Sequence, residues 1–207
     1  MRRCSHGLGA LLLALLLTLI AGCGESVPRL PHLGTQDVIV AFGDSLTYGT
    51  GASEDESYPA VLARLINRPV VRAGVPGEVT AQGLRRLPSV INTYQPHLVI
   101  VCLGGNDMLR KVGEGEIERN LRNMLKLLSQ RGIAAVLVGV PKPALIARAP
   151  GFYADLAREF EVPYEGEILT SVLLAADMKS DPIHPNAKGY RKMAEALARL
   201  LREAGAL

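Results

Sequence analysis

The sequence predicts an α/β fold in which a parallel sheet is covered by helices on both faces. Two observations lead to this prediction. Short apolar runs without polar alternation, typical of strands buried on both faces, recur along the chain. Between them lie longer segments with apolar residues at helical spacing. This alternation favours parallel strands joined by right-handed crossovers. The chain has 207 residues, of which 48% are hydrophobic, so it is long enough for one buried core.

We expect five strands and at least six helices. The expected strands are 38–42, 69–72, 97–103, 133–140 and 162–164. The last one contains Pro163, which places it at an edge of the sheet, because proline cannot donate a ladder hydrogen bond. The expected helices begin near Ser57, Thr80, Glu114, Phe152, Ile168 and Asn186. Ser57, Thr80 and Asn186 have side chains that can cap the first turn.

Residues 1–22 predict a lipoprotein signal peptide rather than a part of the fold. A positive start, Met1-Arg2-Arg3, precedes an apolar stretch over 8–20 that is short for a membrane span. The leader ends in Leu19-Ile20-Ala21-Gly22-Cys23, which resembles the bacterial lipobox and implies that Cys23 is lipidated. The alternative is a plain secretory signal in which Cys23 is incidental.

An exported protein anchored to a bacterial membrane is therefore expected. Gly24 follows the lipobox, which favours the outer membrane by the sorting rule of that class. Residues 23–36 are predicted to form a flexible tether, and 37–207 the folded domain. The only cysteine left is Cys102, inside an apolar strand, so we expect no disulfide.

Charge and composition exclude other classes of function. The net charge of +3 is small and leaves no footprint for nucleic acid. No cluster of histidine and cysteine has metal-ligand spacing, and no cofactor is expected. We expect a monomer whose partners are a membrane, through the anchor, and a small-molecule substrate.

The strand over 38–42 ends at the most informative point of the chain. Gly43 lets the backbone turn sharply, and Asp44 and Ser45 then lie just past the carboxyl end of the strand. Open α/β sheets bind their ligands at that edge. If Ser45 is a nucleophile, it needs a base, a group that orients the base, and donors for an oxyanion.

The segment Asp181-Pro-Ile-His184-Pro185 supplies a candidate base and its orienting group. A neutral imidazole at His184 can take the serine proton and later return it to the leaving group. Asp181 precedes it by three residues and can hold the other ring nitrogen. The alternative is an ordinary surface turn with polar residues.

Candidate oxyanion donors follow two other strands. Asn106 comes after two glycines, and its amide can donate to a developing negative charge. Gly77 and Ser45 can each offer a backbone N–H to the same oxygen. The alternatives are a turn asparagine and a simple turn glycine.

In chain order these residues form four blocks that resemble the motifs of the SGNH, or GDSL-type, hydrolases. The blocks are Gly43-Asp44-Ser45-Leu46, Gly77, Gly104-Gly105-Asn106-Asp107 and Asp181-x-x-His184-Pro185. They extend over nearly the whole predicted domain. The resemblance implies a flavodoxin-like three-layer α/β/α sandwich with a five-stranded parallel sheet.

The same resemblance implies a role for each block residue. Ser45 would be the nucleophile, His184 the base, and Asp181 the group that orients it. The N–H groups of Ser45 and Gly77 and the amide of Asn106 would form the oxyanion hole. The family needs no cofactor for this chemistry.

Two further stretches are similar to the bacterial periplasmic acyl-thioesterase/lysophospholipase and arylesterase group. They are 80–88 and 159–163. The resemblance implies hydrolysis of aryl esters, short- to medium-chain acyl esters, acyl thioesters or lysophospholipids through an acyl-enzyme on Ser45. The alternatives are an envelope carbohydrate acyl-esterase or acyltransferase and a non-enzymatic lipid-binding lipoprotein.

One departure from the motifs and five residues near them complete the expectations. The group often has Ser-Gly-Asp-Thr where this chain has Pro76-Gly-Glu-Val-Thr80, so this loop has one N–H fewer. We expect Tyr48 to pack against the fold, with lining the pocket as the alternative. Arg85-Arg86 is expected on a solvated helix face, with lipid headgroups as the alternative partner. Asp44 and Asp107 are expected to brace the loops by hydrogen bonds.

Overall fold

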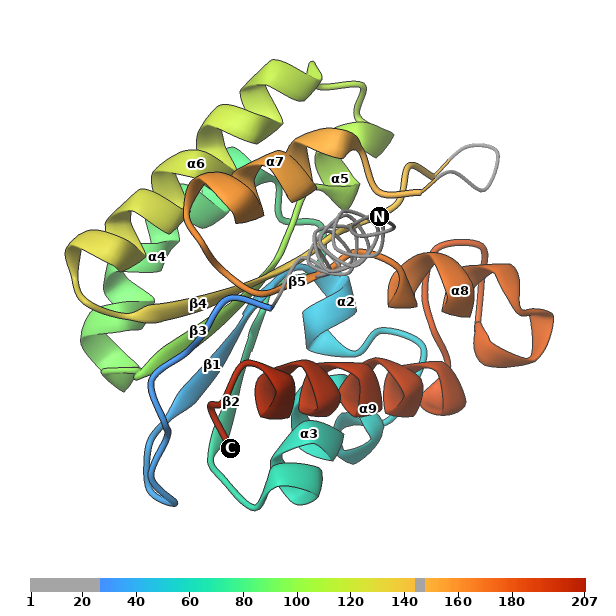
Figure 1. Ribbon diagram of the computed structural model, residues 1–207. Helices are drawn as coiled ribbons and strands as arrows, with labels where there is room; N and C mark the ends of the chain where they lie inside the picture. Colours follow the sequence, from blue (N-terminus) through green and yellow to red (C-terminus); the bar gives the residue numbers. More distant parts are fainter. Residues whose placement is uncertain (1–26, 144–147) are drawn as a thin grey trace, which may run out of the picture.

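The computed structural model of the protein describes residues 27–143 and 148–207 (Figure 1). The signal peptide over 1–22 and the lipidation site at Cys23 lie outside the described residues. So does Cys4. The predicted domain boundary at 37 falls within a segment that the structure places, and this segment is treated below.

A five-stranded, fully parallel sheet forms the centre of the domain, as predicted. Its strands are β1 (Ile39–Gly43), β2 (Val70–Gly74), β3 (Leu98–Cys102), β4 (Ala134–Val138) and β5 (Tyr164–Glu165). Their spatial order is β2-β1-β3-β4-β5. In the register, Ile39 of β1 lies opposite Val70 and Leu98. Every residue of β1 and β3 is buried, because helices cover both faces of these two strands.

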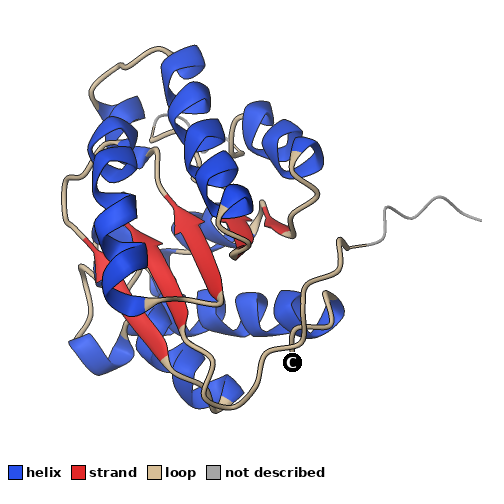
Figure 2. Cartoon of the chain, turned by 90° about the vertical axis from the view of Figure 1, so that its left-hand side faces the viewer, coloured by secondary structure: helices blue, strands red, loops and turns tan. Residues whose placement is uncertain are grey.

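The helices form two layers that enclose the sheet (Figures 1 and 2). They are α2 (Ser45–Tyr48), α3 (Tyr58–Ile66), α4 (Thr80–Tyr94), α5 (Gly105–Leu109), α6 (Glu114–Gln130), α7 (Gly151–Glu159), α8 (Ile168–Leu174) and α9 (Ala187–Glu203). Helices α3 and α9 cover one face, and α4, α6 and α7 cover the other (Figure 1). This is the three-layer sandwich that the resemblance implied. Over the described ranges, no helix combines the length and the apolar character needed to cross a membrane.

Two of the three predicted helix caps work differently from the expectation. The Asn186 side chain accepts the N–H of Gly189 at 3.1 Å and caps α9, as predicted. Ser57 occupies the cap position of α3, but its hydroxyl donates back to the carbonyl of Glu54. Thr80 is the first residue inside α4 and not its cap, because its own N–H and hydroxyl are both taken by Asp107.

The described part of the predicted tether packs on the domain, which corrects that expectation for 27–36. The N–H of Leu30 donates to the carbonyl of Ala204 at 2.9 Å, and the N–H of Leu33 donates to that of Ala206 at 2.9 Å. The side chain of Leu33 is 2% exposed. An apolar side chain and two backbone hydrogen bonds therefore hold this segment against the C-terminal end of the chain.

The last strand lies at the edge of the sheet, as Pro163 predicted, but it begins two residues later than expected. β5 comprises Tyr164 and Glu165, and it pairs only with β4. Pro163 lies just before it, where its carbonyl still accepts the N–H of Leu137 at 3.0 Å. Proline can accept but cannot donate, so the ladder begins one residue later.

Candidate active site

Ser45 begins a one-turn helix, α2, directly after the first strand. The sequence predicted a loop here. The helix forms because the carboxylate of Asp44 occupies its cap position and accepts the N–H of Leu46 at 3.0 Å. A Cβ at Gly43 would collide with the hydroxyl of Thr47 and the carbonyl of Cys102, so the turn into α2 requires glycine.

The structure brings Ser45, His184 and Asp181 into one hydrogen-bonded row. The Nε2 atom of His184 lies 3.0 Å from the Oγ atom of Ser45. Its Nδ1 atom lies 2.7 Å from Oδ2 of Asp181. An ionised carboxylate only accepts, so Nδ1 carries the proton and Nε2 is left to accept from the serine hydroxyl. The row is arranged for a serine proton to pass to the imidazole.

The loop that carries Asp181 and His184 is held by its own backbone. Oδ1 of Asp181 accepts the N–H of Ile183 at 2.8 Å and that of His184 at 2.9 Å. The N–H of Ser180 donates to the carbonyl of His184 at 2.9 Å, which closes the loop. The aspartate thus fixes both the imidazole and the backbone that bears it.

Asp181 stays ionised over a wide range of pH. Partial burial pushes its pKa upward, but the N–H of Ile183 and the imidazole of His184 together lower the pKa below its usual value. An ionised Asp181 keeps the imidazole in the tautomer that Ser45 needs.

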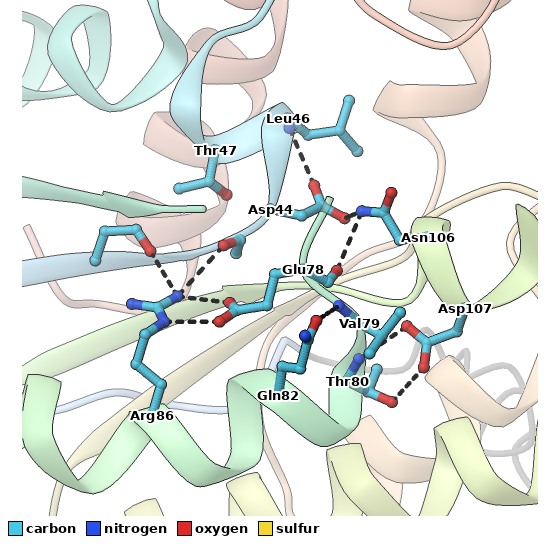
Figure 3. Close-up of polar contacts among 12 residues, drawn as sticks. Asp44, Leu46, Thr47, Glu78, Val79, Thr80, Gln82, Arg86, Asn106 and Asp107 are labelled. Carbon is cyan, nitrogen blue, oxygen red and sulfur yellow. Dashed lines mark hydrogen bonds and ion pairs between the residues drawn. The ribbon is translucent and has the colours of Figure 1, made fainter. Parts of the chain in front are cut away.

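Asn106 lies in the first turn of α5, where β3 ends, and its amide is engaged on both N–H groups. Nδ2 lies 3.0 Å from Oδ2 of Asp44 and 3.1 Å from the carbonyl oxygen of Glu78 (Figure 3). Two acceptors at one end of the amide identify that end as the nitrogen. The sequence predicted the amide as a donor, but it did not predict these two partners.

Gly77 and Ser45 offer backbone N–H groups beside that amide. Gly77 has φ +78, a left-handed conformation that favours glycine. Within the described residues, neither the N–H of Gly77 nor that of Ser45 has a protein acceptor. Ser45, Gly77 and Asn106 all line one cavity. The three residues predicted to supply the oxyanion donors therefore line a common space.

Burial has a large effect on Asp44, which accepts from the Asn106 amide. Asp44 is 1% exposed. Burial raises its pKa from 3.8 to about 7, although the N–H of Leu46 and the amide of Asn106 oppose that rise. Asp44 braces the site by hydrogen bonds, as expected, at a considerable cost in desolvation.

Arg86 contradicts the expectation of a solvated helix face. Its guanidinium bonds the carboxylate of Glu78, which is itself buried. Arg86 lies three residues after Gly83 and four before Val90, both of which face the core. This spacing could have indicated that Arg86 lies on the core-facing side of α4. The adjacent Arg85 obscured it, because two successive arginines suggest a solvated face.

Of the remaining expectations around the site, the one for Asp107 holds and the one for Tyr48 does not. Asp107 accepts the N–H of Thr80 at 2.8 Å and its hydroxyl at 2.6 Å, so it ties α5 to the start of α4. Tyr48 does not line the cavity, but it is also not packed into the fold as expected: it is 45% exposed, and its ring lies against the guanidinium of Arg72, whose carbon is 4.6 Å from the ring centroid.

The cavity over the carboxyl ends of the strands has a volume of about 450 Å³. Its apolar wall comprises Leu46, Leu109, Val140, Leu173, Leu174 and Ile183. Lys142 and Lys179 are the cations among its described lining. Ser45 and His184 lie in its wall, so a molecule that fills the cavity contacts both residues directly.

Comparison with known proteins identifies the family of the chain. Residues 41–192 match the GDSL-like lipase/acylhydrolase family model. The thioesterase 1/protease 1/lysophospholipase L1 of Escherichia coli is 33% identical over 173 residues, which cover 80% of this chain and 83% of that one. Esterase TesA of Pseudomonas aeruginosa is 27% identical, with 86% of this chain and 93% of that one covered.

A solved structure supports the same assignment. The crystal structure of AlinE4, an SGNH-hydrolase family esterase, is 33% identical to this chain and superposes with a TM-score of 0.64. The match covers 83% of this chain and 98% of that one. With its parallel sandwich and the serine at the end of β1, this chain belongs to the GDSL-like lipase/acylhydrolase family of serine acyl-ester hydrolases.

Proposed function

We propose that Ser45 attacks the carbonyl carbon of a carboxylic ester or thioester and forms an acyl-enzyme. The observation that carries this proposal is the continuous contact from Ser45 through His184 to Asp181, at 3.0 and 2.7 Å, in the wall of an apolar cavity. His184 is the general base and Asp181 orients it. Each of these groups has the partner that its role requires.

The chemistry proceeds in two halves. As the Oγ–C bond forms, the proton of Ser45 passes to Nε2 of His184, and the carbonyl oxygen becomes an oxyanion. The oxyanion is stabilised by the N–H groups of Ser45 and Gly77 and by the Asn106 amide, and a single donor of this kind contributes about 10²–10³ in rate. The imidazolium then protonates the leaving alcohol or thiol as its bond to the acyl carbon breaks. In the second half, His184 takes a proton from a water molecule, which attacks the acyl-enzyme. The bond to Ser45 breaks, and the carboxylic acid is released.

The cavity favours an acyl chain of short to medium length. Its volume of about 450 Å³ falls in the range of about 300–1,000 Å³ that suits small ligands. Its wall is mainly leucine, isoleucine, valine and proline, which suits hydrocarbon. Among its described lining residues there is no Trp, Tyr or Phe on which a sugar could stack, so an acylated carbohydrate is the less favoured substrate. Names of relatives, which include thioesterase, lysophospholipase and arylesterase, agree with acyl esters.

A fluorophosphonate probe tests the nucleophile. We expect stoichiometric labelling on the peptide that carries Ser45, and no labelling or p-nitrophenyl butyrate turnover in Ser45→Ala. Ser53→Ala is the matched control, because Ser53 is an exposed serine outside the cavity. Labelling of another residue, or turnover that persists in Ser45→Ala, would contradict the proposal. A series of acyl esters and acyl-CoAs of graded length then defines the substrate.

We also propose that Cys23 is lipidated and anchors the enzyme to the outer membrane. The lipobox-like sequence supports this. Leu30 and Leu33 pack at the C-terminal end of α9, whereas α9 begins beside His184. The anchor would therefore join the domain at the edge opposite the cavity. Intact mass and membrane fractionation of wild type and Cys23→Ser test this. A wild type that carries several acyl chains on Cys23, with Cys23→Ser released from membranes, is expected, and an unmodified cysteine would overturn it.

A further inference from the structure

An ion pair between the buried Glu78 and the partly exposed Arg86 adjoins the Asn106 amide. Nε of Arg86 donates to Oε1 of Glu78 at 2.8 Å, and its Nη2 donates to Oε2 at 2.7 Å (Figure 3). The contact is bidentate, the geometry in which guanidinium and carboxylate bind most strongly. Glu78 is 5% exposed, and the side chain of Arg86 is 25% exposed. Neither residue lines the cavity, so the pair does not touch substrate.

Arg86 also holds the ends of two strands. Its Nη2 atom donates to the carbonyl of Ala73 in β2 at 3.1 Å, and the carbonyl of Gly43 in β1 lies 3.5 Å away. The guanidinium lies over the ring of Phe42, 4.3 Å from its centroid. Gly43 is two residues before Ser45. One side chain from α4 therefore connects the strand that presents Ser45 to the loop that contains Gly77.

The residue that Arg86 clamps contacts one candidate oxyanion donor and adjoins another. The backbone carbonyl of Glu78 accepts the Asn106 amide at 3.1 Å, and Gly77 is the residue before Glu78 in the chain. An oxyanion in the cavity would share the amide hydrogen that Glu78 now accepts. The position of Glu78 thus bears directly on the Asn106 amide, and through the chain on the neighbouring Gly77.

Such a pair is weak evidence for a purely stabilising role. Desolvating two charges is expensive, and replacing a buried ion pair by apolar residues is often neutral or stabilising. The pair instead fixes the geometry of one loop against two strand ends. We propose that Glu78 and Arg86 are positioning residues for the oxyanion site, an inference that rests on the function proposed above.

This role predicts a loss in kcat and not in KM. Donors that are misplaced stabilise the transition state less, whereas ground-state binding in the apolar cavity is unchanged. For Glu78→Gln and Arg86→Lys we expect kcat for p-nitrophenyl butyrate to fall about 10- to 100-fold, less than the roughly 10²–10³-fold loss of a whole donor. KM should stay within about twofold. Arg86→Lys keeps the positive charge but loses the planar guanidinium that bonds both carboxylate oxygens of Glu78. It therefore tests geometry and not charge.

Coupling to Asn106 separates positioning from a general effect on the fold. If Glu78 acts through the amide, Glu78→Gln should cost clearly less in an Asn106→Ala background than in the wild type. An equal fold-loss in both backgrounds would contradict the proposal.

A remote ion pair provides the matched control. Nε of Arg122 lies 3.0 Å from Oε1 of Glu159, in a contact between α6 and α7 that is outside the cavity. Arg122→Lys should leave kcat unchanged. If Glu78→Gln does not fold, the double variant Glu78→Met/Arg86→Met replaces it, since an apolar pair can restore packing. Folded variants of the Glu78–Arg86 pair with wild-type kcat would overturn this inference. An inactive Ser45→Ala would still support the proposed function in that case.

Discussion

The site consists of two regions with opposite environments. The row of Ser45, His184 and Asp181 reaches solvent: the side chain of Asp181 is 45% exposed and that of His184 is 15% exposed. The network beneath it is buried, with Asp44 at 1% and Glu78 at 5%. The row is built largely from one local loop, whereas the network joins β1, the loop after β2, α4 and α5 (Figure 3).

The contrast follows from the two kinds of chemistry. Proton transfer requires a group that can meet substrate and water, and a local loop is enough to position it. Stabilising an oxyanion requires dipoles that do not reorganise, and these act most strongly where water is excluded. We therefore expect changes to the row to affect rate and changes to the network to affect both rate and stability.

The largest expected effect is on the exposed row. His184→Ala removes the base and should lower kcat by about 10⁴-fold. Among the residues that the structure describes, its side chain forms hydrogen bonds only with Ser45 and Asp181, so the midpoint of thermal unfolding should change little. Turnover and thermal denaturation of the same preparation check both statements. A large loss of stability would mean that the row, too, is part of the structural core.

Asn106→Ala should show the mixed behaviour of the buried network. We expect kcat to fall by about 10²–10³. The change also leaves Oδ2 of buried Asp44 without the amide, which should lower the free energy of unfolding by about 1–3 kcal/mol. Denaturant titration and steady-state kinetics measure the two. Asn123→Ala, at an exposed asparagine of α6, is the control and should alter neither.

The smallest expected effect is a difference in pKa between the carboxyl groups of Asp44 and Asp181, which titration can measure. Asp44 should titrate at a pKa of about 7, raised by burial, and Asp181 below its usual range. Because the folded state binds the Asp44 proton more tightly than the unfolded state, its contribution to stability is complete below about pH 4 and is lost as pH rises towards 7. For Asp181 the sign is reversed, and its contribution is lost only in acid. Carboxyl ¹³C NMR titration measures both pKa values. A pKa of Asp181 above that of Asp44 would contradict the contrast between an exposed row and a buried network.

The sequence predicted the parallel sheet and the residues of the row for specific physical reasons. The run Val38–Phe42 has no polar residue, which is typical of a strand covered on both faces. Asp181 and His184 are three residues apart between prolines, so their contact is local. Ser45 and Asn106 follow apolar strands, and parallel strands bring such positions to one edge.

The buried network was less predictable because it depends on tertiary geometry. Whether Arg86 faces solvent or Glu78 is decided by how α4 is rotated against the sheet, and the preceding Arg85 made a charged face the simpler interpretation. The partners of the Asn106 amide depend on where the Glu78 carbonyl points. The packing of Leu33 likewise depends on a surface provided by the far end of the chain.

Trapping the acyl-enzyme tests the central assignment most directly. The protein is mixed with p-nitrophenyl butyrate, quenched in acid within the first turnovers, digested and analysed by mass spectrometry. We expect one butyryl group on the peptide that contains Ser45, and none on that peptide in Ser45→Ala. A butyryl group on a different residue, or full turnover in Ser45→Ala, would contradict the assignment of Ser45 as the nucleophile.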